Sequence, residues 1–173
     1  MTLFNVTIFT VILILTPIAI TGFSLAPWVP TRKKDLERIN KIANLKKGEI
    51  FYELGSGNGK VSYYIAKNNP DVKVHGFELS FPLLIYSKLI NLFFKEKNLK
   101  FKLRNIFKQD LSKADVIYVF GMPKVLENKL KEKILKEVKK GTRIISYTFK
   151  IEGLNPVKKD ILEKQASIYL YEI

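Results

Sequence analysis

The segment EIFYELGSGNG, at residues 49–59, decides the fold of this chain. Residues 49–54 are mostly apolar and predict a buried strand, and glycines then follow at positions 55, 57 and 59. Glycine permits a sharp turn from a strand into a helix, and it lets a ligand approach the backbone closely. We therefore expect a strand, a ligand-binding turn and a helix that begins near Gly59.

Segments of helix type and strand type alternate along the rest of the chain. This alternation implies a mostly parallel sheet with helices on both faces, which is a Rossmann-like α/β fold of six or seven strands. The expected helices lie at about residues 59–69, 82–97 and 124–140, and the further strands at residues 72–79, 100–103, 114–121, 142–149 and 165–173.

Two acidic residues stand at the ends of the first two predicted strands. Glu53 lies two residues before Gly55, and Glu78 lies 19 residues beyond Gly59. A dinucleotide site typically has the spacing G-x-G-x-x-G and holds a pyrophosphate, which a neighbouring carboxylate would repel. The carboxylate of Glu53 would instead attract the ammonium group of S-adenosylmethionine (SAM), and Glu78 can accept hydrogen bonds from both ribose hydroxyls. The pattern favours SAM, and the alternative is a purely structural turn in another α/β domain.

The first thirty residues carry no ionisable side chain, although the whole chain has 30 Lys and Arg, 16 Asp and Glu and a net charge of +14. Residues 3–23 would form a helix about 31 Å long, close to the thickness of the hydrocarbon core of a bilayer. We expect a transmembrane anchor at residues 1–25, a connector and a helix at 26–48 with Thr31 as N-cap and an end at 47–48, and the catalytic domain at 49–173. The alternatives are a cleaved signal peptide, which the missing basic n-region disfavours, and a buried helix of the domain.

The charge distribution also predicts orientation and partners. The basic residues follow the apolar segment, so the positive-inside rule places the catalytic domain of a single-pass protein on the cytoplasmic, or equivalent inner, side of the membrane. The chain has no cysteine and one histidine, which excludes disulfides and thiolate or multi-histidine metal sites. The sequence offers no aromatic and basic platform for RNA. We therefore expect a lipid bilayer as partner, and neither a metal nor a nucleic acid.

Four segments resemble the membrane-anchored seven-β-strand protein lysine methyltransferases, a group that includes the mitochondrial enzymes acting on the ATP synthase c-subunit and the adenine nucleotide translocase. The resemblance runs from about Ala26 to Lys158 and has an apolar anchor ahead of it. The glycine turn is shared by most SAM methyltransferases, whereas the Pro-Trp-Val-Pro-Thr segment is more specific. The segments are WVPT at residues 28–31, FYELGSGNGK at 51–60, GFEL at 76–79 and FGMP at 120–123.

The resemblance implies a SAM-dependent protein lysine N-methyltransferase whose substrate is a membrane protein with an accessible lysine. It implies that Glu53, Gly55 and Gly57 hold the methionine part of SAM and that Glu78 holds the ribose. The segment after the predicted strand at 142–149 is short, which leaves open whether one strand or helix of the usual fold is absent.

Asn105 and Ile106, after the third predicted strand, would meet the adenine. The family often has Asp where Asn58 and Asn105 stand here, and Asn105 would meet the adenine through its amide. The complete set of implied cofactor contacts is Thr31, Glu53, Leu54, Gly55, Ser56, Gly57, Glu78, Leu79, Asn105, Ile106 and Phe120.

The resemblance also implies a pocket for the acceptor amine. Phe120, Gly121 and Met122 would border the transferred methyl group, and Trp28 and Thr31 would close the site from the membrane side. Trp28, Phe120 and Met122 are thus the pocket candidates, although Trp28 could be only an anchor at the membrane interface. No residue stands out as a general base.

Three other functions share parts of this pattern. A membrane enzyme that methylates a lipid or another small amine would use the same cofactor site and anchor. An RNA methyltransferase would fit the basic charge. A tethered interaction module that binds SAM without catalysis would keep the glycine turn and both acidic residues.

Overall fold

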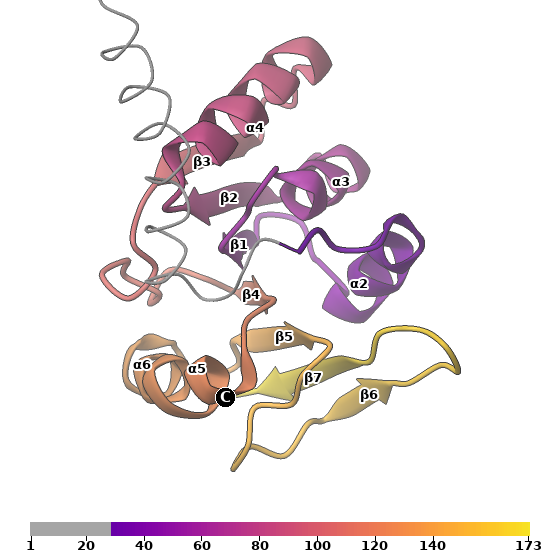
Figure 1. Ribbon diagram of the computed structural model, residues 1–173, viewed down its shortest axis with the longest axis vertical. Helices are drawn as coiled ribbons and strands as arrows, with labels where there is room; N and C mark the ends of the chain where they lie inside the picture. The colour runs from indigo at the N-terminus through magenta and orange to yellow at the C-terminus, as the bar shows by residue number, and fades with distance from the viewer. Residues whose placement is uncertain (1–28) are drawn as a thin grey trace, which may run out of the picture.

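The computed structural model describes residues 29–173, and these form one seven-stranded sheet between two helical layers (Figure 1). The strand order is β3-β2-β1-β4-β5-β7-β6. The first five strands are parallel, and β7 runs antiparallel to both β5 and β6. The expected Rossmann-like arrangement is therefore confirmed, with seven strands. They are β1 Ile50–Leu54, β2 Lys73–Glu78, β3 Leu99–Leu103, β4 Val116–Val119, β5 Arg143–Tyr147, β6 Lys158–Asp160 and β7 Ile168–Glu172.

Helices cover both faces because alternate residues of each strand point to opposite sides. On β1, Phe51 packs into the core under α2, α3 and α4, whereas Tyr52 and Leu54 pack into the core under η2 and α6. The helical elements are η1 Lys33–Asp35, α2 Leu36–Ala43, α3 Lys60–Asn68, α4 Phe81–Phe94, α5 Pro123–Val125, the π-helical turn η2 Leu126–Leu130, and α6 Lys131–Glu137.

The prediction of Thr31 as a helix N-cap is wrong. The side chain of Thr31 is buried, and its hydroxyl lies 2.8 Å from the hydroxyl of Tyr118. The 3-10 helix η1 instead begins after Arg32, which makes no side-chain capping bond. The predicted end at 47–48 is also wrong, because Asn44 adopts a left-handed conformation with φ of 44° and ends α2 at Ala43.

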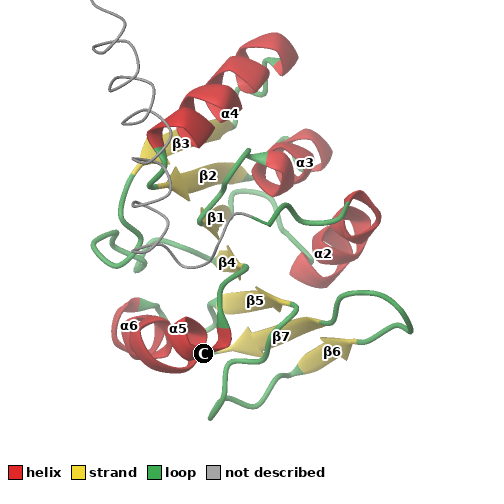
Figure 2. Cartoon of the chain, in the orientation of Figure 1, coloured by secondary structure: helices red, strands yellow, loops and turns green. Residues whose placement is uncertain are grey.

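The short segment that follows β5 contains no helix, but it leads into a further strand, β6. Residues 148–157 contain no helix, and Figure 2 shows this connection as a loop. Strand β6, which the sequence did not predict, has only three residues, Lys158–Asp160, and pairs with β7 at the sheet edge. Its polar residues suit an edge position, where charged side chains oppose pairing with other chains.

The predicted anchor at residues 1–25 and the pocket candidate Trp28 lie outside the described residues. Within residues 29–173, no helix has both the length and the apolar character needed to cross a bilayer.

Candidate active site

The glycine turn joins β1 to α3 in a conformation that requires glycine. Gly55, Gly57 and Gly59 have φ of 76°, 52° and 76°, the left-handed region that residues with a side chain rarely adopt. The backbone N–H groups of Gly55 and Ser56 both donate to the carbonyl of Phe77, at 2.9 Å, so the turn is fixed against the end of β2. This places the turn at the carboxyl edge of the sheet, where ligands of such folds bind.

Gly59→Ala is expected to lower the free energy of unfolding by about 2–5 kcal/mol. A Cβ at Gly59 would lie 2.5 Å from the ring of Phe101, an overpacking that costs roughly 1–3 kcal/mol, and the left-handed backbone adds about 1–2 kcal/mol. The matched control is Gly48→Ala, which has φ of 84° but nothing within 4 Å of the added Cβ. Urea denaturation should therefore show only the backbone cost, about 1–2 kcal/mol, for the control. Equal losses in both variants would contradict the role of Phe101.

Glu78 is held at the end of β2 by three backbone donors. Its Oε2 accepts a bond of 2.7 Å from the N–H of Gly57, and its Oε1 accepts bonds from Leu79 and Ser80 at 2.9 and 2.7 Å. A carboxylate has about four lone-pair sites, so the Glu78 carboxylate can still accept from a ligand after these three bonds. The Glu78 carboxylate is therefore positioned beside the glycine turn, as a ribose acceptor would be.

Glu53 is buried behind the turn, where its Oε2 accepts bonds from the backbone N–H of Ser62 at 2.8 Å and from the Ser62 hydroxyl at 2.5 Å. Burial raises the pKa of Glu53 to about 8; the two Ser62 bonds oppose this rise, and the charge of Glu78 adds to it. A cationic group bound nearby would favour the carboxylate form of Glu53.

SAM binding at pH 7 is accordingly expected to release up to about one proton per molecule bound. A carboxyl with a pKa of about 8 is mostly protonated at pH 7, and the SAM ammonium lowers that pKa on binding. Calorimetry in phosphate and in Tris, which differ in ionisation enthalpy, measures the protons released. Glu53→Gln should bind SAM without this release. A release that persists in Glu53→Gln would contradict the assignment to this side chain.

Asn105 and Ile106 follow β3 at the same edge of the sheet. The side-chain oxygen of Asn105 accepts a bond of 2.9 Å from the N–H of Phe107, which directs the amide nitrogen to other partners. Ile106 is buried in the core that contains Tyr52 and Leu54. The amide nitrogen of Asn105 is thus available as a donor, whereas Ile106 belongs mainly to the core.

The segment before η1, at residues 29–32, contacts both the start of α3 and β4 through Thr31. The ammonium group of Lys60, at the start of α3, donates to the backbone carbonyl of Thr31 at 2.9 Å. The hydroxyl of Thr31 contacts Tyr118, which is almost completely buried. Thr31 therefore lies close to the turn, and Tyr118 belongs to the core.

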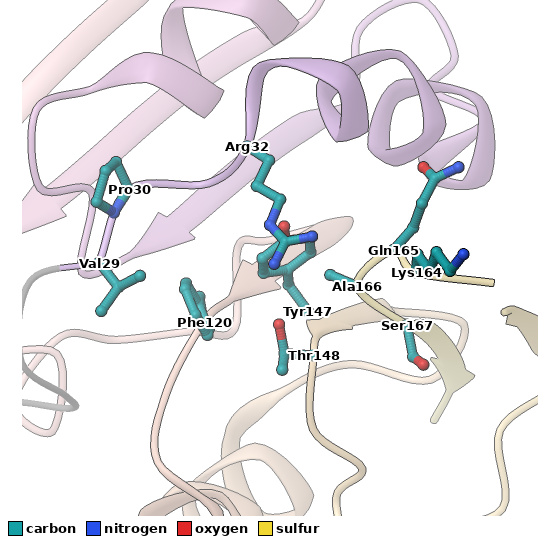
Figure 3. A pocket seen from close by; sticks show the side chains of 10 residues that line it. All are labelled: Val29, Pro30, Arg32, Phe120, Tyr147, Thr148, Lys164, Gln165, Ala166 and Ser167. Atoms are coloured by element: carbon teal, nitrogen blue, oxygen red, sulfur yellow. The ribbon is translucent and has the colours of Figure 1, made fainter. Parts of the chain in front are cut away.

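A pocket of about 520 Å³ opens beyond the carboxyl ends of β4 and β5 (Figure 3). The rings of Phe120 and Tyr147 lie edge to face in its wall, with centroids 4.9 Å apart. Figure 3 shows Arg32 directed toward Tyr147. Four segments line the pocket, namely residues 29–32, the end of β4, the end of β5 and the loop before β7: Val29, Pro30, Arg32, Phe120, Tyr147, Thr148, Lys164, Gln165, Ala166 and Ser167.

Of the three predicted pocket residues, Phe120 lines the pocket, whereas Trp28 lies outside the described residues. Met122 is 43% exposed at the start of α5 and is not among the lining residues that the structure describes, and Gly121 is buried. Sequence reasoning missed Tyr147, although it lies near the carboxyl end of the predicted strand at 142–149, at the edge where ligands bind. The contribution of residues 164–167 had no sequence signal, because it depends on how the last hairpin folds.

The residues of the cofactor site are suited to bind SAM. The hydroxyl of Ser56 is buried in the turn without a hydrogen-bond partner among the described residues. Buried polar atoms are normally paired, so this hydroxyl is suited to a ligand atom. Within residues 29–173 there is no cluster of three or more metal-ligating side chains. The strand order, the glycine turn after β1 and the acid at the end of β2 together define a Rossmann-like SAM-dependent methyltransferase.

Comparisons with known proteins give the family. The ANTKMT methyltransferase domain matches residues 53–158. A protein-lysine N-methyltransferase of Saccharolobus islandicus (strain REY15A) is 35% identical over 155 residues, which cover 85% of this chain and 93% of that protein. The chain therefore belongs to the ANTKMT methyltransferase-domain family. A lysine N-methyltransferase of Caenorhabditis elegans, named for the ATP synthase c-subunit, is 28% identical over 133 residues, covering 71% of this chain and 66% of that protein.

Solved structures agree on the fold and the cofactor. An RNA methyltransferase from Salinibacter ruber, in complex with S-adenosyl-L-homocysteine, is similar with a TM-score of 0.78 and 25% identity, covering 84% of this chain and 94% of that chain. A SAM-dependent methyltransferase from Aquifex aeolicus has a TM-score of 0.66 and 16% identity, covering 80% and 89%. The chain is a SAM-dependent methyltransferase.

Proposed function

We propose that this enzyme transfers methyl groups from SAM to the side-chain amine of a lysine in a protein substrate at a membrane. The observation that carries the proposal is the pocket with Phe120 and Tyr147 in its wall, beside the cofactor site at the same edge of the sheet. The names of the relatives from Saccharolobus islandicus and Caenorhabditis elegans support lysine as the acceptor.

The lining of the pocket suits a neutral amine. SAM supplies an electrophilic methyl group on a cationic sulfur, so the attacking lysine must be uncharged. Deprotonating a lysine at pH 7 costs about 4.6 kcal/mol, because its free pKa is about 10.4. Apolar surroundings and neighbouring cations both lower that pKa. Phe120 supplies an apolar wall and Arg32 and Lys164 supply positive charge, whereas the described lining contains no carboxylate.

The residues around the pocket have positioning roles in this proposal. The ring of Phe120, held edge to face against Tyr147, would restrict the lysine side chain to a path toward the methyl group. The phenol of Tyr147 donates to Asp35, and burial and this carboxylate raise the pKa of Tyr147 to about 12. Tyr147 therefore stays protonated at neutral pH and does not act as the base. Water would accept the lysine proton before transfer.

The membrane part of the proposal rests on the sequence. Residues 3–23 are apolar, the first thirty residues are uncharged, and the remainder carries the net charge of +14. A single anchor at residues 1–25, a connector and helix at 26–48 and a catalytic domain at 49–173 would hold the pocket near the inner leaflet. A lysine of a membrane protein, close to the headgroups, would then be the natural substrate.

Mass spectrometry of cells with and without the enzyme tests this function. Lysine methylation should disappear from one or a few membrane proteins on deletion, and it should return with the intact gene but not with Glu78→Ala.

Parallel labelling with radioactive SAM, followed by separation of protein, lipid and RNA, compares the acceptor classes. Label only in lipid would indicate an amine-lipid enzyme, and label only in RNA would indicate the activity named for the Salinibacter ruber structure. No label in any fraction would indicate a non-catalytic SAM-binding module. Loss of methylation only from soluble proteins would contradict the membrane part.

A further inference from the structure

The outward face of α4 is apolar over the full length of the helix. Leu92 and Phe93 are 70% and 79% exposed, and among the fourteen residues of α4 only Leu84 and Ser87 are buried. Contiguous exposed apolar patches mark surfaces that contact a partner or a membrane. The exposed large apolar side chains of this helix, here called the α4 patch, are Phe81, Ile85, Tyr86, Leu89, Leu92, Phe93 and Phe94.

α4 differs from an ordinary surface helix, which turns its polar residues outward, because it is apolar on its outer as well as its inner side. Ser87 faces the protein, where its hydroxyl donates to the backbone carbonyl of Gly57 at 3.0 Å. α4 approaches the glycine turn closely, because a Cβ on Gly59 would lie 3.1 Å from the Cβ of Ser87. This contact holds Ser87 inward, and the large apolar side chains of the α4 patch therefore point outward.

The α4 patch is bordered by positive charge. Residues 81–97 contain three cationic side chains and one acidic residue, Glu96, which gives +3 − 1 = +2. All three cations are exposed, and none forms an ion pair with a carboxylate in residues 29–173. The cations are Lys88, Lys95 and Lys97.

We propose that α4 lies on the surface of an anionic lipid bilayer, with the α4 patch at the boundary of headgroups and acyl chains and the cations Lys88, Lys95 and Lys97 among the headgroups. A helix with a continuous apolar face and lysine flanks has the chemistry of such interfacial helices. Each cation close to an anionic leaflet raises the affinity roughly five-fold. The proposal rests on the membrane location in the proposed function, but it does not depend on which amine is methylated.

Other occupants fit the charges less well. A second copy of this chain would bring two cationic borders together, and like charges repel. Residues 1–28 contain no carboxylate, so they could cover the apolar side chains but could not neutralise the three cations. An anionic bilayer can bury the apolar side chains of the α4 patch and can also attract the neighbouring cations.

Docking of α4 would also orient the active site. α4 begins at Phe81, three residues after Glu78, so its first turn lies at the edge of the sheet that carries the cofactor site (Figure 1). A bilayer along α4 would then bring the mouth of the site close to the headgroups, where a lysine at the end of a transmembrane segment lies.

Single-cysteine labelling of the full chain tests the proposal, because the chain has no native cysteine. Leu92→Cys places an environment-sensitive fluorophore on the α4 patch. Leu135→Cys is the matched control, since Leu135 is a 51% exposed leucine on α6, across the sheet from α4. Both labelled proteins are reconstituted into vesicles of phosphatidylcholine and phosphatidylglycerol. We expect the label at position 92 to brighten several-fold and to be quenched by spin-labelled lipid, and the label at position 135 to keep its emission in water.

Three outcomes would overturn the proposal. A label at position 92 that stays water-exposed in vesicle-bound protein excludes lipid contact by α4. A label already shielded without vesicles, in a sample that sediments as a dimer or as a monomer, assigns the α4 patch to a second copy or to residues 1–28, respectively. An equal response in vesicles of pure phosphatidylcholine would remove the requirement for anionic lipid. Methylation is not part of this readout, so failure here and failure of the proposed function are separable.

Discussion

Glu78→Ala is expected to weaken SAM binding by at least about a hundredfold, while the protein remains folded. The Glu78 carboxylate is the expected acceptor for two ribose hydroxyls, and hydrogen bonds to a charged group contribute about 1.5–3 kcal/mol each. The substitution also leaves the backbone N–H groups of Gly57, Leu79 and Ser80 without their acceptor, which loosens the turn that the cofactor contacts. Isothermal titration calorimetry measures the affinity directly.

Glu78→Gln separates charge from shape in the same experiment. The amide keeps one acceptor oxygen and the size of the side chain, so an intermediate loss of roughly tenfold is expected. Circular dichroism and a melting curve establish that both variants are folded. A folded Glu78→Ala variant that binds SAM within threefold of the unmodified protein would place the cofactor elsewhere.

Asp35→Ala is expected to lower the free energy of unfolding by about 2–5 kcal/mol, because it removes one of the two carboxylates of Arg38 and leaves the buried hydroxyl of Tyr147 without its acceptor. Asp35 is completely buried, its Oδ1 pairs with Arg38 at 2.8 Å, and its Oδ2 accepts from the hydroxyl of Tyr147 at 2.7 Å. Arg38 also pairs with Asp160 at 2.8 Å and donates to the carbonyl of Ala166 at 3.0 Å. Urea denaturation measures the loss.

The matched control for Asp35→Ala lies two residues away. Glu37 pairs with Lys41 at 2.7 Å, but both side chains are largely exposed. Solvent and salt screen such exposed pairs, which contribute little to stability, so Glu37→Ala should be nearly neutral. Similar losses in the two variants would show that the burial of Asp35 does not matter.

The sequence predicted those parts of the molecule that depend on local pattern. The strand before Glu53, the glycine turn and the acid at Glu78 are encoded by residue type and spacing over thirty residues, and the structure gathers them at one edge of the sheet. The alternation of strands and helices predicted the parallel part of the sheet for the same reason. Strand β6 was missed because three polar residues, Lys158–Asp160, carry no apolar period.

Features that depend on distant contacts were not predictable. The sequence indicated a strongly apolar helix near residues 82–97, but a helix that is apolar on all sides gives no signal for its inner face. That face is set by Ser87 against the glycine turn. The pocket likewise combines Arg32 with Tyr147 and with residues 164–167, and no local rule brings these segments together.

The ion pair between Arg38 and Asp160 has a consequence for biosynthesis. Its partners are 122 residues apart, and Asp160 belongs to the last hairpin of the chain. A ribosome releases α2 early, together with the apolar face that contributes Leu36 and Ile39 to the core, whereas the hairpin that α2 contacts emerges last. The domain can therefore complete its folding only near the end of translation. A chain truncated before β6 would leave part of α2 uncovered and accessible to chaperones and proteases.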